Sequence, residues 1–294
     1  MRKKSWKNSD SFEQFKFLLP ALIPVIFLSL LPLVRGITLG FTDYQFGGEI
    51  SFNGIQNYLR MLGDYNFWQS FKTGFIWSIG TTGGQLILGL GLALILNKQF
   101  ALRGWARVLV LVPWAMPPVI RGIMWRFMYH PQMGGINHLL INLGIIDAPI
   151  NWLSSFDFAL GAVIIVGIWG GLPQVGITLL AGLQSITPQL YEAAKIDGAG
   201  DFQQFLYITL PQLAPIAIAI TILRLIWNFN SFGLVHVLTR GGPGGNTRIP
   251  MLFAYEEGFK YGDLGYAAAL GNVMVIIVSV LMVSYLYIKL KEEF

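Results

Sequence analysis

The chain has 294 residues, of which 54% are hydrophobic and only 12% are charged, and its mean hydropathy is +0.58. Soluble domains carry about 25% charged residues, so the composition excludes an ordinary soluble protein and indicates one that lies in a membrane. The formal net charge is +5 and cysteine is absent, which excludes disulfides and cysteine-ligated metal sites.

Apolar runs long enough to cross a bilayer recur along the chain, since a spanning helix needs about 20 predominantly apolar residues. The runs without Asp, Glu, Lys or Arg are 17–34, 73–97, 158–191, 202–223 and 264–288. A further run, about 105–129, is interrupted by Arg107, Arg121 and Arg126 and is the weakest of the set. We therefore predict an all-α membrane protein with six transmembrane helices in residues 17–290, flanked by short segments at 1–16 and 291–294.

The basic residues predict which side each loop faces, because lysine and arginine in short loops mark the cytoplasmic side. They gather in residues 1–16, near 98–107 and at 289–291, whereas the loop 129–157 contains none. Six spans with both termini cytoplasmic satisfy this pattern, and it explains the net positive charge without nucleic-acid binding. We expect the first apolar run to be a retained helix, because no small-residue cleavage pattern of a signal peptide follows it.

Several of these runs contain prolines and glycines, as in "VPWAMPPV" (112–119) and "GIWGGLPQVG" (167–176). Proline removes a backbone donor and kinks a helix, and freed backbone groups at membrane depth require protein or a water-filled cavity around them. Such helices indicate a path through the membrane; the alternative is that glycine and proline are simply commoner in membrane helices than in soluble ones. Outside the runs, "GGINHLLINLGI" (134–145) predicts a helix lying along the membrane surface.

A polar segment, 187–211, separates the fourth and fifth runs on the predicted cytoplasmic side. Thr187 followed by Pro188 favours a helix start, and Gly198 favours a helix end after Asp197. A second helix is expected from Asp201, with Gln204 completing a capping box. The first helix has only about ten residues and is too short to be stable alone in water, so it either docks on a partner protein or lies as a connector under the lipid headgroups.

The spacing in this segment resembles the EAA signature of permease subunits in binding-protein-dependent ABC importers. Glu192-Ala193-Ala194 is followed after three residues by Gly198 and after nine more by Ile-Thr-Leu-Pro at 208–211. The resemblance implies the type I ABC importer permease fold, with a coupling helix that docks in a cleft of a cytoplasmic ATPase. The positions that it assigns to ATPase coupling are Glu192, Ala193, Ala194, Asp197 and Gly198.

Residues 238–271 resemble the segment before the last span in carbohydrate permeases of the maltose and glycerol-3-phosphate type. The large external domain of the enterobacterial maltose subunit is missing, so maltose itself does not follow. The resemblance implies a subunit without enzymatic activity or cofactor in a bacterial cytoplasmic membrane. Its implied partners are a second homologous permease, a cytoplasmic ATPase dimer, an extracytoplasmic solute-binding protein and a carbohydrate, besides membrane lipid.

A carbohydrate site needs polar groups for hydroxyls and aromatic faces for the sugar ring. Two stretches provide both, "GIWGGLPQVG" in the fourth run and "RLIWNFNSFG" (224–233) in the fifth. In the second stretch, residues 224, 227, 228 and 231 are spaced i, i+3, i+4 and i+7, which predicts one helix face. The candidate substrate-binding residues are Trp169, Gly171, Gln174, Arg224, Trp227, Asn228 and Ser231, and the resemblance implies this role for all of them except Arg224. Helix packing is the alternative.

Arg121 and Arg224 lie inside predicted spans that contain no acidic residue. Arginine at membrane depth is costly and marks a functional site or a buried ion pair. One hypothesis is that the substrate is anionic, either an acidic oligosaccharide or a phosphorylated polyol. The alternative is that both side chains reach the membrane interface or bind backbone carbonyls near the helix ends.

The sequence contains no phosphate-binding GxxxxGK[ST] loop, so ATP hydrolysis is assigned to a partner. His130, His138 and His236 are scattered, and we expect no metal site. An ion-coupled secondary transporter is the main rival, but it requires carboxylates within the spans or paired broken helices in two related halves. Neither feature is visible, and a membrane-embedded enzyme lacks candidate catalytic residues.

Overall fold

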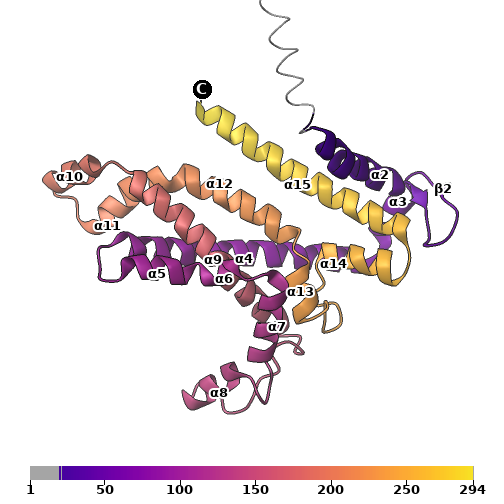
Figure 1. Cartoon of the computed structure of the whole chain (residues 1–294), viewed down its shortest axis with the longest axis horizontal. Helices are drawn as coiled ribbons and strands as arrows, with labels where there is room; N and C mark the ends of the chain where they lie inside the picture. The colour runs from indigo at the N-terminus through magenta and orange to yellow at the C-terminus, as the bar shows by residue number, and fades with distance from the viewer. Residues whose placement is uncertain (1–19, 21, 294) are drawn as a thin grey trace, which may run out of the picture. The chain divides into compact units, whose positions relative to one another are not determined.

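The computed structural model describes residue 20 and residues 22–293 (Figure 1). The predicted flanking segment 1–16 and the beginning of the first predicted span lie outside these residues. The chain divides into two compact units, residues 1–63 with 254–275, and residues 64–253 with 276–294. Each unit is described by itself.

The first unit contains helices and a short antiparallel β-ribbon in which Thr42 pairs with Phe52. Arg60 forms ion pairs with Asp263 at 2.6 Å and with Glu257 at 3.7 Å. Desolvation alone would lower the pKa of Arg60, but the hydrogen bond to Asp263 and the nearby carboxylates raise it overall. The elements are η1 (Ile26–Leu30), α2 (Leu31–Leu39), β1 (Thr42–Asp43), β2 (Ser51–Phe52), α3 (Gln56–Gly63), η3 (Glu256–Lys260) and the beginning of α15 (Leu264–Glu293).

The second unit is built around two long helices, α4 and α9, which pack against each other, with α12 against both (Figure 1). Its elements are α4 (Tyr65–Asn97), α5 (Arg103–Val110), α6 (Val112–Ala115), α7 (Pro118–Met128), α8 (Gly135–Asn142), α9 (Ala159–Ser185), α10 (Pro188–Ile196), α11 (Asp201–Gln204), η2 (Phe205–Thr209), α12 (Leu210–Phe229), α13 (Gly233–Leu238) and the first residues of α14 (Pro250–Tyr255). The helix predicted within 134–145 is present as α8.

Five helical segments in the described part of the chain are long and apolar enough to cross a membrane: Leu22–Leu39, Tyr65–Asn97, Ala159–Ser185, Asp201–Phe229 and Leu264–Tyr287. A sixth span exists if α5–α6 and α7 are counted together. The prediction of a helical membrane protein is therefore confirmed. The last helix, α15, continues through Glu293.

The third predicted span, 105–129, is not one helix. Arg103–Ala115 and Pro118–Met128 meet at an angle of 94°. Met116 has an extended backbone and is followed by Pro117 and Pro118. Proline disfavours the helical conformation in the residue before it and cannot donate the helical hydrogen bond, so the helix breaks there.

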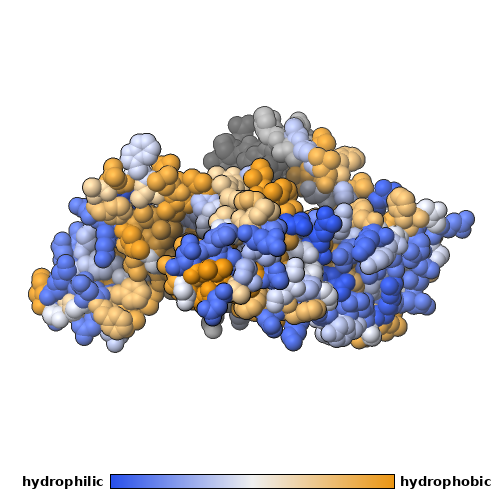
Figure 2. Space-filling model, turned by 90° about the horizontal axis from the view of Figure 1, so that it is seen from below, coloured by the Kyte–Doolittle hydropathy of each residue, from blue (hydrophilic) through white to orange (hydrophobic). Residues whose placement is uncertain are grey.

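The surface of the protein carries many large apolar side chains. Figure 2 shows broad apolar areas beside hydrophilic ones. Ile87, Leu88 and Ile95 on α4 and Val108 and Leu109 on α5 are among the exposed residues. Exposed apolar area of this extent is unusual in soluble monomers and is what helices in contact with lipid require.

Small residues permit the close contact between α4 and α9. A Cβ atom added at Gly89 would lie 2.8 Å from Cγ1 of Val175 and 3.3 Å from the backbone nitrogen of Gly176. Near this contact, a buried apolar cluster includes Ala93, Leu96, Val175 and Leu179. Close backbone approach at small residues is a common way for membrane helices to pack.

The packing role of Gly89 is testable with Gly89→Ala. We expect this variant to be destabilised by about 1–3 kcal/mol, because the added methyl group overpacks the contact with α9. Gly91→Ala is the matched control: nothing lies within 4 Å of its added Cβ, and alanine is favoured over glycine in a helix by up to about 1 kcal/mol. Thermal unfolding of the purified protein in detergent measures both. Equal melting temperatures for the two variants would contradict the packing role.

Candidate functional site

The middle of α9 is irregular in a way that suits a site. Pro173 lies inside the helix and cannot donate the hydrogen bond that the carbonyl of Trp169 normally accepts. Gly170 and Gly171 are buried and have no side chains. This part of α9 therefore presents open backbone to its neighbours, at about half the length of the span.

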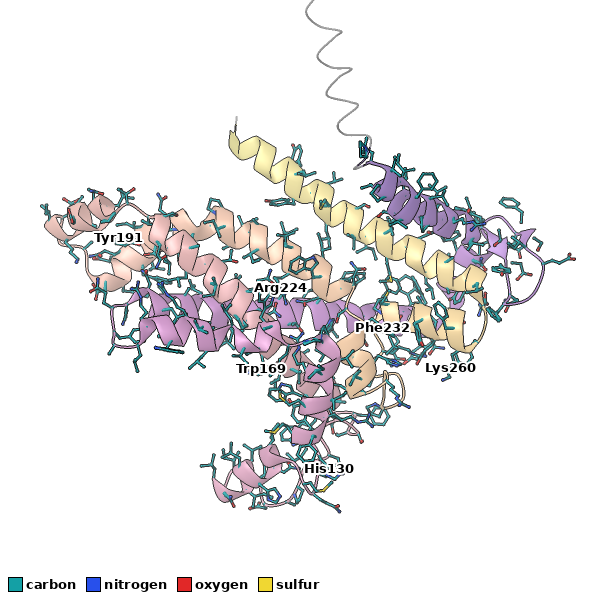
Figure 3. The ribbon with its side chains drawn as sticks, viewed as in Figure 1. His130, Trp169, Tyr191, Arg224, Phe232 and Lys260 are labelled. Atoms are coloured by element: carbon teal, nitrogen blue, oxygen red, sulfur yellow. The ribbon has the colours of Figure 1, made fainter. Side chains whose placement is uncertain are left out.

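A network of polar side chains joins α12 to α4 and α9 at this level. Arg224 donates from Nε to Oε1 of Gln85 at 2.8 Å and from a terminal nitrogen to Oε1 of Gln174 at 3.2 Å. Gln85 is fully buried, and its Nε2 donates to the carbonyl oxygen of Gly167 at 2.9 Å. Figure 3 labels Arg224 on α12 and Trp169 on α9. The guanidinium of Arg224 is thus held by two neutral amide oxygens from two other helices.

Asn228, one turn further along α12, extends the network. Its Nδ2 donates to Oγ1 of Thr82 at 2.9 Å and, more weakly, to Oε1 of Gln85 at 3.4 Å. Its backbone oxygen accepts from Nε1 of the buried Trp77 at 2.8 Å. These bonds engage the side-chain nitrogen and the backbone oxygen of Asn228, so this residue positions α12 against α4.

Arg121 from α7 reaches the same part of α9. A Cβ atom at Gly170 would overlap its guanidinium, and one at Gly171 would overlap Arg224 and the amide of Gln85. The ring of Trp125, one turn after Arg121, meets the ring of Trp169 edge-on, with centroids 5.5 Å apart. The two arginines therefore lie beside consecutive residues of α9, close enough for their charges to repel.

The structure brings together four of the residues predicted to bind substrate: Gly171, Gln174, Arg224 and Asn228. The indole of Trp227 lies next to them, with its ring centre 5.8 Å from the guanidinium carbon of Arg224. The prediction of one helix face from Arg224 through Ser231 is wrong at its last position. α12 ends at Phe229, so Ser231 lies in the following turn.

The sequence analysis did not select Gln85, and it interpreted Arg121 only together with Arg224, as a sign of an anionic substrate or of side chains that reach the membrane interface or backbone carbonyls. Gln85 stands inside a long apolar run, and a strongly polar side chain in such a run is itself a signal of function or of interhelical bonding. The sequence does not predict that Gln85, Arg121 and Arg224, which belong to three separate spans, meet at the same level of the helices.

The segment 187–211 folds as a short helix, a turn and a second helix. α10 covers Pro188–Ile196, and Gly198 has φ +80°, a conformation that favours glycine. The predicted capping box at Asp201 and Gln204 is wrong by one residue. The N-cap is Gly200, whose N–H donates to Oε1 of Gln203 at 3.0 Å, and Gln204 instead donates to the carbonyl oxygen of Ala199 at 2.8 Å. The side chain of Thr187 forms no cap bond.

α10 is attached on one side and exposed on the other. The hydroxyl of Tyr191 bonds Oγ1 of Thr209 in η2 at 3.0 Å, which ties α10 to the beginning of α12. Glu192 and Ala193 are exposed, and Ile196 is 87% exposed. This short helix therefore has an exposed surface of mixed apolar and charged character.

A separate pocket of about 320 Å³ lies where α7, the loop before α9 and the end of α13 meet. The hydroxyl of Tyr129 donates to the carbonyl oxygen of Ala162 at 3.1 Å. Nδ1 of His130 accepts two backbone N–H bonds, which leaves the proton of the neutral ring on Nε2. The pocket is lined by Arg126, Tyr129, His130, Pro131, Asn151, Trp152, Leu153, Ser154, Leu238, Thr239 and Arg240. It offers hydrogen-bond donors and no carboxylate.

Among the residues that the structure describes, no three His, Asp or Glu side chains are grouped closely enough to hold a metal ion. The polar groups at the middle of α9 are amides and guanidinium groups, which bind ligands by hydrogen bonds and charge. The arrangement is therefore suited to the recognition of a ligand.

Relatives of known type match nearly the whole chain. The trehalose/maltose transport system permease protein MalF of Thermococcus litoralis is 38% identical over 278 residues, which cover 94% of this chain and 92% of the relative. The sulfoquinovosyl glycerol transport system permease protein SmoG of Agrobacterium fabrum is 34% identical over 259 residues, covering 87% and 83%.

Solved structures match in fold. A chain of a bacterial ABC transporter involved in the import of the acidic polysaccharide alginate superposes with a TM-score of 0.81 at 22% identity, covering 97% of this chain and 96% of the other. The type I ABC importer permease fold is therefore confirmed. The family model for the inner membrane component of binding-protein-dependent transport systems matches residues 85–291. The chain belongs to this family of ABC importer permeases.

Proposed function

We propose that this chain is one transmembrane subunit of an ATP-driven importer that carries a carbohydrate delivered by a solute-binding protein. The observation that carries the proposal is the polar network at the middle of α9, where Arg224, Gln85 and Gln174 meet beside Trp227. Polar donors next to aromatic faces are the two elements that sugar recognition requires. The names of the relatives, trehalose/maltose and sulfoquinovosyl glycerol permeases, support the same class.

The substrate contacts are assigned to α9 and α12. Trp169 and Gly171 border the irregular part of α9, and Trp227 exposes half of its surface beside Arg224. Gln174 and Asn228 are engaged in bonds within the protein, so we assign them to positioning as much as to direct contact. Ser231, in the turn after α12, completes the candidate site.

α10 is the coupling element in this proposal. The family acts with an ATPase in a separate subunit, and the exposed surface of α10 is the part that we assign to its cleft, through Glu192, Ala193, Ala194, Asp197 and Gly198. A displacement of α10 would pass through the Tyr191–Thr209 bond to η2 and along the continuous helical segment Asp201–Phe229 to Arg224. One helix thus joins the ATPase contact to the substrate contacts, as rigid-body alternating access requires.

The proposed assembly contains a second homologous permease and an ATPase dimer besides this chain and the solute-binding protein. The basic residues favour a bacterial cytoplasmic membrane with both termini on the cytoplasmic side, which places α10 on the ATPase side. A phosphorylated-polyol importer is the alternative within this class. An ion-coupled secondary transporter is disfavoured, because the apolar runs contain no carboxylate for ion coupling.

The docking role of α10 is tested by Glu192→Lys. Charge reversal at an interface contact is expected to lower ATPase association or substrate-stimulated ATP hydrolysis by about tenfold or more, while membrane insertion survives because Glu192 is exposed. Co-purification with the ATPase and hydrolysis in proteoliposomes measure this. Asp147→Lys, an equal charge change at an exposed residue outside α10, is the control. Normal transport by Glu192→Lys would refute the docking role.

The connection from α10 to α12 is tested by Tyr191→Phe, which removes only the hydroxyl that bonds Thr209. Loss of one hydrogen bond is worth about 0.5–1.5 kcal/mol, so we expect the coupling between ATP hydrolysis and transport to fall about 2- to 10-fold with the ATPase still bound. Tyr207→Phe is the matched control, because Tyr207 lies in the neighbouring η2 and is exposed. Equal transport per ATP hydrolysed in both variants would count against this connection.

The carbohydrate-binding role of Trp227 is tested by Trp227→Ala. Its indole is 51% exposed, so folding should tolerate the change, whereas loss of an aromatic contact with the substrate should reduce transport by about tenfold. Trp105→Ala, at a residue that is 68% exposed on α5, should leave uptake unchanged. Uptake of labelled glycan into proteoliposomes gives the readout. Equal uptake by both variants would remove Trp227 from the site.

A further inference from the structure

We propose that Arg121 and Arg224 together form a binding site for an oxyanion on the imported carbohydrate, a carboxylate or sulfonate attached to a sugar ring. Gln85 and Gln174 are the positioning residues that hold Arg224 in place. The inference rests on the proposed carbohydrate import, and it adds the charge class of the substrate and a second cationic residue to the site.

The two charged groups lie deep within the span. The guanidinium groups lie beside Gly170 and Gly171, near the middle of the 27-residue helix α9. An arginine that relieves its burial by snorkelling extends toward the end of the span. Neither guanidinium does so. Both are directed at the same glycine pair, which has room for them only because it lacks Cβ atoms.

The positive charges of Arg121 and Arg224 are not matched by acidic groups among the described residues. In the described part of the chain Arg121 makes no side-chain hydrogen bond and no ion pair, and its buried Nε has no partner. Arg224 donates hydrogen bonds to the neutral amide oxygens of Gln85 and Gln174. Buried charges in proteins are normally paired. Two neighbouring cations without a carboxylate give this part of the site a positive charge that an anionic substrate group would neutralise.

The groups that hold Arg224 in place are neutral amides. A glutamine oxygen accepts a hydrogen bond from a guanidinium but carries no charge, so Gln85 and Gln174 fix the direction of Arg224 without cancelling its charge. Gln85 is itself fixed by its bond to Gly167. Nη2 of Arg224 lies beside Gly171 and makes no hydrogen bond among the described residues, so we assign it to the ligand. A planar guanidinium fork matches a carboxylate or sulfonate in two parallel bonds.

The aromatic side chains around the two arginines favour a sugar over a small anion as the ligand. Trp169 adjoins Gly170 in the chain and packs edge-on against Trp125, and Trp227 lies beside Arg224. The buried Nε1 of Trp125 has no hydrogen-bond partner among the described residues and adds a donor. A site lined by aromatic rings with a few convergent polar donors is the usual form of a small-molecule site.

The experiment uses the assembled importer with its binding protein in proteoliposomes. A uronate oligosaccharide, the same oligosaccharide with its carboxyl groups reduced, a sulfonated sugar and glycerol phosphate are compared as substrates. Wild type is expected to transport the uronate or sulfonated sugar. Arg224→Gln and Arg121→Gln should each reduce that transport by about 10- to 100-fold, since hydrogen bonds to charged groups are the strong ones. Arg224→Lys should retain an intermediate rate, because it keeps the charge and loses the fork.

Calorimetry at low and high salt measures direct binding of the uronate oligosaccharide to the purified permease–ATPase complex. This measurement separates recognition by this chain from selection by the binding protein. Binding should weaken with salt in wild type and do so less steeply in Arg224→Gln, which keeps only the charge of Arg121. Arg103→Gln removes an equal charge outside the site and should change neither readout. Arg121→Gln and Arg224→Lys give the answer if Arg224→Gln fails to assemble.

The outcomes separate the two proposals. Equal transport of the uronate and its reduced form, unaffected by the arginine variants, would overturn the oxyanion site and leave carbohydrate import standing. Transport of glycerol phosphate in place of the sugars would overturn the sugar-bound oxyanion. If no glycan is transported at all, carbohydrate import itself is wrong.

Discussion

The central constraint in this protein is a guanidinium group held at mid-span among apolar helices. Arg224 carries a permanent charge, and a charge at that depth requires polar partners. Gln85 on α4 and Gln174 on α9 supply two of them, and the bonds of Asn228 to Thr82 and Gln85 strengthen the same junction. The relative positions of α4, α9 and α12 therefore depend on one polar network, and the candidate site is a direct product of how that charge is accommodated.

In the proposed function, substrate recognition and energy coupling share one continuous helical segment. Asp201–Phe229 begins beside α10, where Tyr191 bonds Thr209, and ends at the residues that meet α9. Because a helix is stiff along its axis, a movement at its beginning is transmitted to Arg224 and Trp227 at its other end. α10 is too short to be stable alone in water, and its exposed Ile196 and Glu192 are the residues that the proposed ATPase contact would cover.

Glycine serves two purposes in the long helices, and the two are distinguishable by what lies opposite. Gly89 faces the backbone of α9 at Gly176, so it permits helix packing. Gly170 and Gly171 face guanidinium groups and an amide, so they permit polar side chains to lie against the backbone of α9. From the sequence alone, both sets read as small residues in apolar runs.

The sequence by itself determined the features that depend on local composition. These are the apolar spans, whose length reflects bilayer thickness, the boundaries of α10, which follow from Pro188 and Gly198, and the family, which follows from the spacing around Glu192. Only the tertiary structure decided the 94° break at Met116, the meeting of Gln85, Arg121 and Arg224 at one level, and the position of Ser231 beyond the end of α12. The physical reason is that a hydropathy pattern is a property of each helix alone, whereas the rotation and depth of a helix are set by its contacts with neighbours far away in the chain.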